Sequence, residues 1–226
     1  MFYFLFENYL NFFNFFNVFQ YITFRSIMGG LFSFCFVIYI GKAFIKYVTD
    51  KKSLENINKY LDENHRKKSG TPNMGGVLIV SSVLLSLILF GNLNNEKVLI
   101  LIFSFLAFFI SGFIDDYKKI KTGEGLRIKT KLLIQSIITI IILLLVWKFY
   151  QPFQYLNNSY NLENIILPFT KEIYNISFYY YLLFILIILG SCNAVNFTDG
   201  LDGLATGNLI ISFTTLTIIS YLAGNF

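Results

Sequence analysis

Six long apolar runs constrain this chain more than any other feature of its sequence. A helix rises about 1.5 Å per residue, so roughly 20 residues cross a hydrocarbon core about 30 Å thick. In lipid, a single apolar run satisfies its backbone hydrogen bonds only as a helix. The sequence therefore predicts an all-α, polytopic integral membrane protein, with a single transmembrane domain over residues 1–226. Its six transmembrane helices are expected at about 22–48, 75–91, 98–114, 132–150, 177–195 and 203–223.

The composition agrees with this class of protein. Hydrophobic residues make up 55% of the 226 residues and charged residues only 14%. That is more apolar surface than a soluble core of this size can bury.

Lysine and arginine gather in two of the predicted loops. The loop between the first and second spans and the loop between the third and fourth carry most of them. The positive-inside rule therefore places both loops in the cytoplasm and the N-terminus outside. The net charge of +5 then belongs to two loops at the membrane surface. This favours anionic lipid or an anionic substrate as partner and gives no support to nucleic acid.

Three polar clusters fall on the predicted cytoplasmic side. They are "HRKKSGTPNMGG" before the second span, "FIDDY" with Asp115 and Asp116 at the end of the third, and "NAVNFTDGLDG" at the end of the fifth. Glycine-rich turns let backbone amides approach a phosphate closely, and Mg²⁺ mediates between carboxylates and phosphate oxygens. Lysines supply further positive charge as charge shifts toward the leaving group. Together the clusters predict phosphoryl-type chemistry at the inner membrane surface.

Each cluster also has a structural explanation. The macrodipole disfavours acids at a helix C-terminus, and Lys118 or Lys119 could compensate the acidic pair there without any function. Asp199 or Asp202 could cap the sixth helix while neighbouring glycines allow the turn. The basic run at residues 66–68 could be a positive-inside anchor. A functional site is favoured over these structural explanations, because the third and fifth spans both carry carboxylates to the cytoplasmic side of the membrane.

The motifs also resemble those of a known family. "GTPNMGG", "FIDDY" and "NAVNFTDGLDGLA", in this order, are similar to motifs of the phospho-N-acetylmuramoyl-pentapeptide transferases, and "FNVFQYITFR" fits that family's opening. The resemblance runs from about Phe16 to Phe226. It implies transfer of phospho-MurNAc-pentapeptide from UDP-MurNAc-pentapeptide to undecaprenyl phosphate, with Mg²⁺ required and lipid I and UMP as products. It places the protein in peptidoglycan synthesis at the bacterial inner membrane, and a homodimer is compatible with it.

The resemblance implies roles for particular residues of this sequence. Asp115 and Asp116 match the acidic pair, of which the first is the candidate for activating the lipid phosphate as base or nucleophile. Direct attack and a covalent intermediate both stay open. The positions that match contacts to the nucleotide or its phosphates are Lys68, Lys131, Asn193, Asn196, Asp199 and Asp202.

Two departures from the family pattern stand out. Asn73 occupies the second threonine position of the usual GTPTMGG, which keeps donor and acceptor groups but changes their reach. The resemblance also implies ten membrane helices, whereas six are predicted here. The family's main Mg²⁺ ligand and a histidine-rich loop are therefore expected beyond Phe226, which leaves Asp115 as a candidate ligand within this chain. We expect a transferase that is active only when the further helices complete it.

Two alternatives remain open. A sibling enzyme would transfer a HexNAc-1-phosphate from UDP to a polyprenyl phosphate, and a substrate competition assay would separate the two. An ion-coupled transporter would place acids within its spans. The predicted clustering of the acids at one surface fits a transporter poorly.

Overall fold

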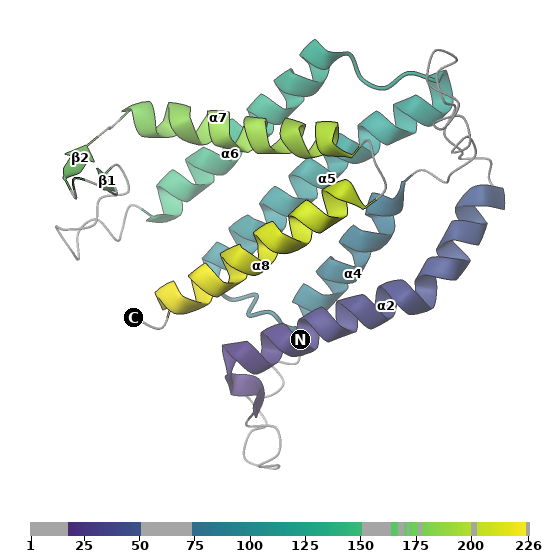
Figure 1. Ribbon diagram of the computed structural model, residues 1–226, viewed down its shortest axis with the longest axis horizontal. Helices are drawn as coiled ribbons and strands as arrows, with labels where there is room; N and C mark the ends of the chain where they lie inside the picture. The colour runs from purple at the N-terminus through teal and green to yellow at the C-terminus, as the bar shows by residue number, and fades with distance from the viewer. Residues whose placement is uncertain are drawn as a thin grey trace. The chain divides into compact units, whose positions relative to one another are not determined.

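The computed structural model describes residues 18–50, 74–150, 164–166, 170, 172–175, 178–199 and 203–224 (Figure 1). The chain forms two compact units, Met1–Pro152 and Phe153–Phe226.

The first unit is built from helices that pack in sequence order. Within its described residues, α2 packs on α4, α4 on α5, and α5 on α6. The four helices are α2 (Ile22–Asp50), α4 (Gly75–Phe90), α5 (Glu96–Thr122) and α6 (Ile128–Tyr150).

The second unit combines two helices with a small hairpin. The helices are α7 (Phe178–Thr198) and α8 (Leu204–Gly224), and the antiparallel strands are β1 (Asn164–Ile166) and β2 (Ile173–Asn175). Ile165 lies opposite Tyr174 in the hairpin. The Tyr174 hydroxyl donates to Oε2 of Glu172 at 2.5 Å, and this hydrogen bond raises the pKa of Tyr174.

The predicted all-helical membrane class is confirmed. Among the described residues, α2, α5, α6, α7 and α8 are long and apolar enough to cross a membrane. The predicted second span is present as α4, but it has only 16 residues. At about 1.5 Å per residue it is about 24 Å long, which is short of a hydrocarbon core. The helix ends at Phe90 and is capped by Gly91, which has an extended backbone and whose N–H bonds to the Leu87 carbonyl at 2.8 Å.

The helices bury little of their apolar surface within the described residues. Large side chains such as Tyr39 on α2 and Phe197 on α7 are 88% and 85% exposed. Apolar surface on this scale is stable only against lipid or against further protein. The structure is therefore that of a multi-pass membrane protein.

Small polar residues hold α2 against α4. The Ser86 hydroxyl donates to the Gly29 carbonyl at 2.7 Å, and the Ser33 and Ser82 hydroxyls lie 3.0 Å apart. A Cβ at Gly29 would come within 2.9 Å of Ser86 Oγ. Small residues of this kind let membrane helices approach closely enough for such hydrogen bonds. The contact fixes α4, the helix that begins within the "GTPNMGG" motif and packs on the site-bearing α5.

Candidate active site

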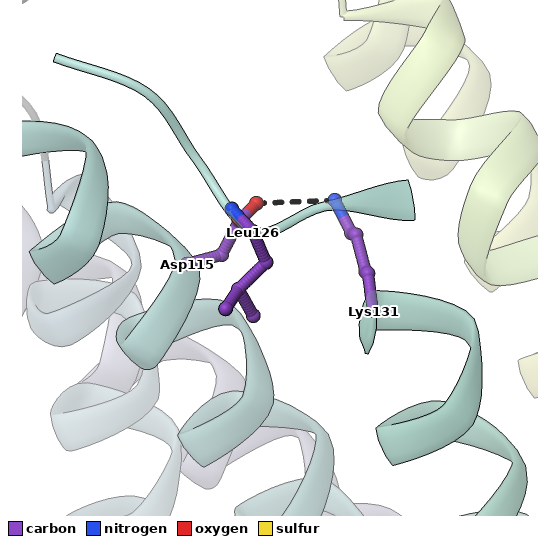
Figure 2. A network of polar contacts seen from close by, with 3 residues as sticks. All are labelled: Asp115, Leu126 and Lys131. Atoms are coloured by element: carbon purple, nitrogen blue, oxygen red, sulfur yellow. Dashed lines mark hydrogen bonds and ion pairs between the residues drawn. The ribbon is translucent and has the colours of Figure 1, made fainter. Parts of the chain in front are cut away.

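Asp115 lies on α5 and has both carboxylate oxygens engaged (Figure 2). Oδ1 accepts a hydrogen bond from the backbone N–H of Leu126 at 2.6 Å, and Oδ2 lies 3.2 Å from Nζ of Lys131. The Asp115 side chain is 22% exposed and that of Lys131 is 20% exposed. Charge-assisted hydrogen bonds that are partly shielded from water are stronger than those between fully solvated groups. Asp115 is therefore held as an oriented anion that solvent still reaches.

The turn between α5 and α6 produces this arrangement. Helix α5 ends at Thr122 because Gly123 adopts a left-handed conformation with φ 77°, and its N–H bonds to the Lys119 carbonyl at 2.9 Å. The chain then returns along α5, which brings the Leu126 N–H back to Asp115. Helix α6 begins at Ile128, so Lys131 lies in its first turn. Two helices and the turn between them thus build one polar site.

The helix bounds correct the sequence argument about the acidic pair. We expected Asp115 and Asp116 at a helix C-terminus, where the macrodipole disfavours them, but α5 continues to Thr122. The apolar run ends near Ile114, whereas the helix ends only where Gly123 caps it. The cation paired with Asp115 is Lys131 on the next helix, whereas the structural explanation of the acidic pair had named Lys118 or Lys119 on α5.

Asp116 follows Asp115 on the same helix. Successive helical residues are rotated by about 100° around the axis, so the two carboxylates leave α5 in different directions. The Asp116 side chain is half-buried. The two acids are therefore neighbours in sequence whose side chains point in different directions from α5.

The start of α4 carries the end of the "GTPNMGG" motif. Met74 has φ 70°, and among the described residues it is the one non-glycine with a positive φ. This conformation costs a non-glycine residue roughly 1 kcal/mol. Such strain gathers where the surrounding structure imposes it, often at functional sites.

The second unit carries the polar residues at the end of α7. Asn193 is half-buried, and its side-chain amide donates to the Leu189 carbonyl at 2.8 Å. Asn196 and Asp199 are exposed. The Asp199 N–H bonds to the Val195 carbonyl at 3.2 Å, so the helical path continues to the end of this segment. The end of α7 thus carries an exposed carboxamide and, directly after it, an exposed carboxylate.

The structure brings together only part of the predicted set. Asp115 and Lys131 are in direct contact in the first unit. In the second unit, Asn193 and Asn196 lie in the last turns of α7, and Asp199 directly follows the helix. Lys68, Asn73 and Asp202 lie outside the described residues.

A capping role for Asp199 or Asp202 at α8 also stays a prediction. The turn before α8 uses Gly203, with φ 83°, as the sequence suggested.

The described residues offer carboxylate oxygens, the kind of ligand that Mg²⁺ prefers. Among the described residues, no three His, Cys, Asp or Glu side chains gather into a group that could hold a metal ion. Mg²⁺ is commonly held by one or two carboxylates together with substrate phosphates and water. Asp115 fits that use in kind, because each of its carboxylate oxygens has two lone pairs and spends only one on the contacts described.

Sequence reasoning missed Leu126. Its contribution is a backbone N–H, which every residue except proline carries, so its identity gives no signal. The glycine before it, in "GEGL", was the available signal, since a glycine in a turn often marks a close approach of the backbone to another group.

The fold is that of a multi-pass membrane protein with a carboxylate–lysine pair at one helix turn, and comparison with known proteins identifies its family. The chain belongs to Glycosyl transferase family 4, whose sequence model matches residues 98–226. The match covers α5 to α8, including Asp115, Lys131 and the end of α7.

Individual relatives of the chain share a more specific name than the family. The phospho-N-acetylmuramoyl-pentapeptide-transferase of Leptospira biflexa is 35% identical over 231 residues, which cover 99% of this chain and 62% of that protein. The proteins of the same name from Rickettsia prowazekii and Desulfotalea psychrophila are each 38% identical, over 91% of this chain and 56% of their own length. The predicted resemblance is thus confirmed, and the chain spans about 60% of the length of these relatives.

Proposed function

We propose that the protein containing this chain transfers phospho-MurNAc-pentapeptide from UDP-MurNAc-pentapeptide to undecaprenyl phosphate, giving lipid I and UMP. The observation that carries the proposal is the Asp115 carboxylate, held by the Leu126 N–H and Lys131 in a chain similar to transferases of that name. An oriented anion beside a lysine supplies the two groups that phosphoryl transfer needs, one for the nucleophile and one for the phosphate.

Asp115 acts on the lipid phosphate in one of two ways. In direct attack, Asp115 accepts the proton of the lipid phosphate. An oxygen of that phosphate then attacks the sugar-bearing phosphorus, and the bond to UMP breaks. In the covalent route, an Asp115 oxygen attacks that phosphorus first and releases UMP, and the lipid phosphate then displaces Asp115. Release of UMP in the absence of lipid phosphate, in an amount equal to the enzyme, would indicate the covalent route.

Lys131 is proposed to contact the substrate phosphate. Its amine is 3.2 Å from Asp115 and 20% exposed, so a short side-chain rotation takes it from the carboxylate to an arriving phosphate oxygen. That transfer leaves Oδ2 of Asp115 open to the nucleophile. A cation placed where negative charge increases lowers the barrier without further rearrangement.

Mg²⁺ is part of the proposal. Asp115 would hold it together with substrate phosphates, and it would neutralise charge on the diphosphate.

The polar end of α7 is proposed as part of the nucleotide pocket. Asn196 and Asp199 are exposed there and offer donor and acceptor groups suited to uracil and ribose. Asn193 and Asp202 are proposed for the same pocket by their places in the motifs, and Lys68 is proposed to contact uridine or phosphate.

The site is proposed to face the cytoplasm. The last turns of α5 and the turn that follows carry a dense set of basic residues beside Asp115, as cytoplasmic ends of membrane helices do. They are Lys118, Lys119, Lys121, Arg127 and Lys129. A nucleotide donor from the cytoplasm and a lipid acceptor from the bilayer would meet at this end. A homodimer stays a prediction.

The proposal is tested by UMP release from UDP-MurNAc-pentapeptide with undecaprenyl phosphate and Mg²⁺, run in parallel with UDP-GlcNAc as donor. Preference for the muramoyl donor supports the proposal. Preference for UDP-GlcNAc would instead identify a HexNAc-1-phosphate transferase, whose chemistry at Asp115 and Lys131 would be the same. The names of the relatives favour the muramoyl donor.

A further inference from the structure

Gly125 lies against the Asp115 carboxylate. A Cβ built on Gly125 would come within 2.8 Å of Asp115 Oδ1, 3.6 Å of its Cγ and 3.8 Å of its Oδ2. Real Cβ atoms essentially never approach another heavy atom within 3.0 Å. Any other residue at position 125 would therefore push the carboxylate or the turn away.

The backbone conformation does not explain this glycine. Among the described glycines, a positive φ occurs at Gly123 and Gly203, and Gly125 is not one of them. The two glycines of the α5–α6 turn thus have different reasons to be there. Gly123 ends α5, and Gly125 makes room for Asp115.

The two contacts of Asp115 also differ in kind. Oδ1 is bonded to a backbone N–H, which moves only if the turn moves. Oδ2 is paired with a lysine amine at the end of a flexible side chain. The Asp115 carboxylate is thus held at Oδ1 by the backbone. Its Oδ2 loses its partner whenever the Lys131 side chain rotates toward another anion.

We infer that Gly125 is a positioning residue for Asp115. By carrying no side chain, it lets the Leu126 N–H close on Oδ1, and this fixes Oδ2 as the oxygen presented to substrate. The inference rests on the proposed function for the catalytic role of Asp115. The contact between Gly125 and Asp115 does not depend on that role.

The contact is tested by a double-mutant cycle on thermal unfolding of the protein in detergent. Gly125→Ala should lower Tm by several degrees when Asp115 is present, because the new methyl group displaces the carboxylate. In an Asp115→Ala background the same substitution should change Tm by no more than about 1 °C, since the clash is gone. If Gly125→Ala alone folds poorly, the comparison between the two backgrounds still tests the contact. An equal loss in both backgrounds would overturn the inference.

Gly112→Ala is the matched control. Gly112 lies on the same helix as Asp115, and a Cβ there would meet no heavy atom of the described residues within 4 Å. The Gly112→Ala substitution should leave both Tm and the rate of UMP release close to those of the wild type.

The positioning role is tested by steady-state UMP release. Gly125→Ala should lower kcat by about tenfold to a hundredfold and leave KM for the UDP donor within about twofold, because misplacing a reacting group by about 1 Å acts on the chemical step. Unchanged kcat in Gly125→Ala, with Asp115→Asn inactive, would overturn the inference and leave the proposed function standing. Full activity of Asp115→Asn would overturn the proposed catalytic role of Asp115, on which the inference rests. No UMP release from the wild type with the muramoyl donor would overturn the proposed function.

Discussion

Replacing Lys131 by methionine tests the ion pair and the proposed phosphate contact at once. Methionine keeps much of the apolar stem and removes the charge. The two charged groups are 3.2 Å apart, and their side chains are 20% and 22% exposed. The pair is therefore intermediate between fully exposed and fully buried ion pairs, for which typical free energies are known. Exposed pairs contribute about 0.2–1 kcal/mol, and removing one partner of a buried pair costs about 3–5 kcal/mol. Because Asp115 keeps the hydrogen bond from the Leu126 N–H, we expect a loss of about 1–1.5 kcal/mol, or roughly 2–6 °C in Tm.

The expected effect of this substitution on activity is larger than its effect on stability. Removing a preorganised group that stabilises charge in the transition state costs about 10²–10³ in kcat, equal to about 2.7–4 kcal/mol. The assay is the rate of UMP release at saturating donor, measured beside Tm for each variant.

Two further variants control the Lys131 experiment. Lys129→Met removes a charge from an exposed position in the same turn of α6 and should keep kcat within about twofold. Lys131→Arg keeps the charge and should retain part of the activity. A Lys131→Met enzyme within about fivefold of wild-type kcat would refute the reasoning that Lys131 serves the phosphate.

Three other substitutions test the helix contacts and the nucleotide pocket. Gly29→Ala should lower Tm by disturbing the hydrogen bond to Ser86, which is worth about 0.6–1.7 kcal/mol in membrane helices. Gly30→Ala, whose Cβ would meet none of the described atoms within 4 Å, should not, and equal effects would contradict this packing. Gly123→Ala places a side chain at φ 77° and should cost about 1 kcal/mol in thermal unfolding, because α5 loses its cap. Asn196→Ala should raise KM for the UDP donor severalfold with Tm unchanged, and an unchanged KM would remove it from the nucleotide pocket.

Hydrophobic length predicted most of the fold, because in lipid an apolar run of about 20 residues has one stable conformation. Hydrophobic length predicted helix ends less well where a helix continues beyond its apolar run. Helix α5 runs past Ile114 through charged residues, which favour helix in water, and stops at Gly123. The hairpin of β1 and β2 was missed because each strand has only three residues, too few for a periodic signal.

The candidate site was predicted as a set of residues, without its contacts. Asp115 and Lys131 were each identified from motifs, but 16 positions separate them. Their contact depends on how the α5–α6 turn reverses the chain. Leu126 acts through its backbone and Gly125 through the absence of a side chain, so neither carries a side-chain chemistry that a motif argument detects.

The most direct test of the account is UMP release from UDP-MurNAc-pentapeptide by the purified protein with undecaprenyl phosphate and Mg²⁺, compared with its Asp115→Asn variant. Asparagine keeps the size of the side chain and removes the charge that Leu126 and Lys131 hold in place. We expect UMP and lipid I from the wild type and a loss of at least about a hundredfold in the variant. Equal rates from the two proteins would contradict the central claim that Asp115 performs the chemistry.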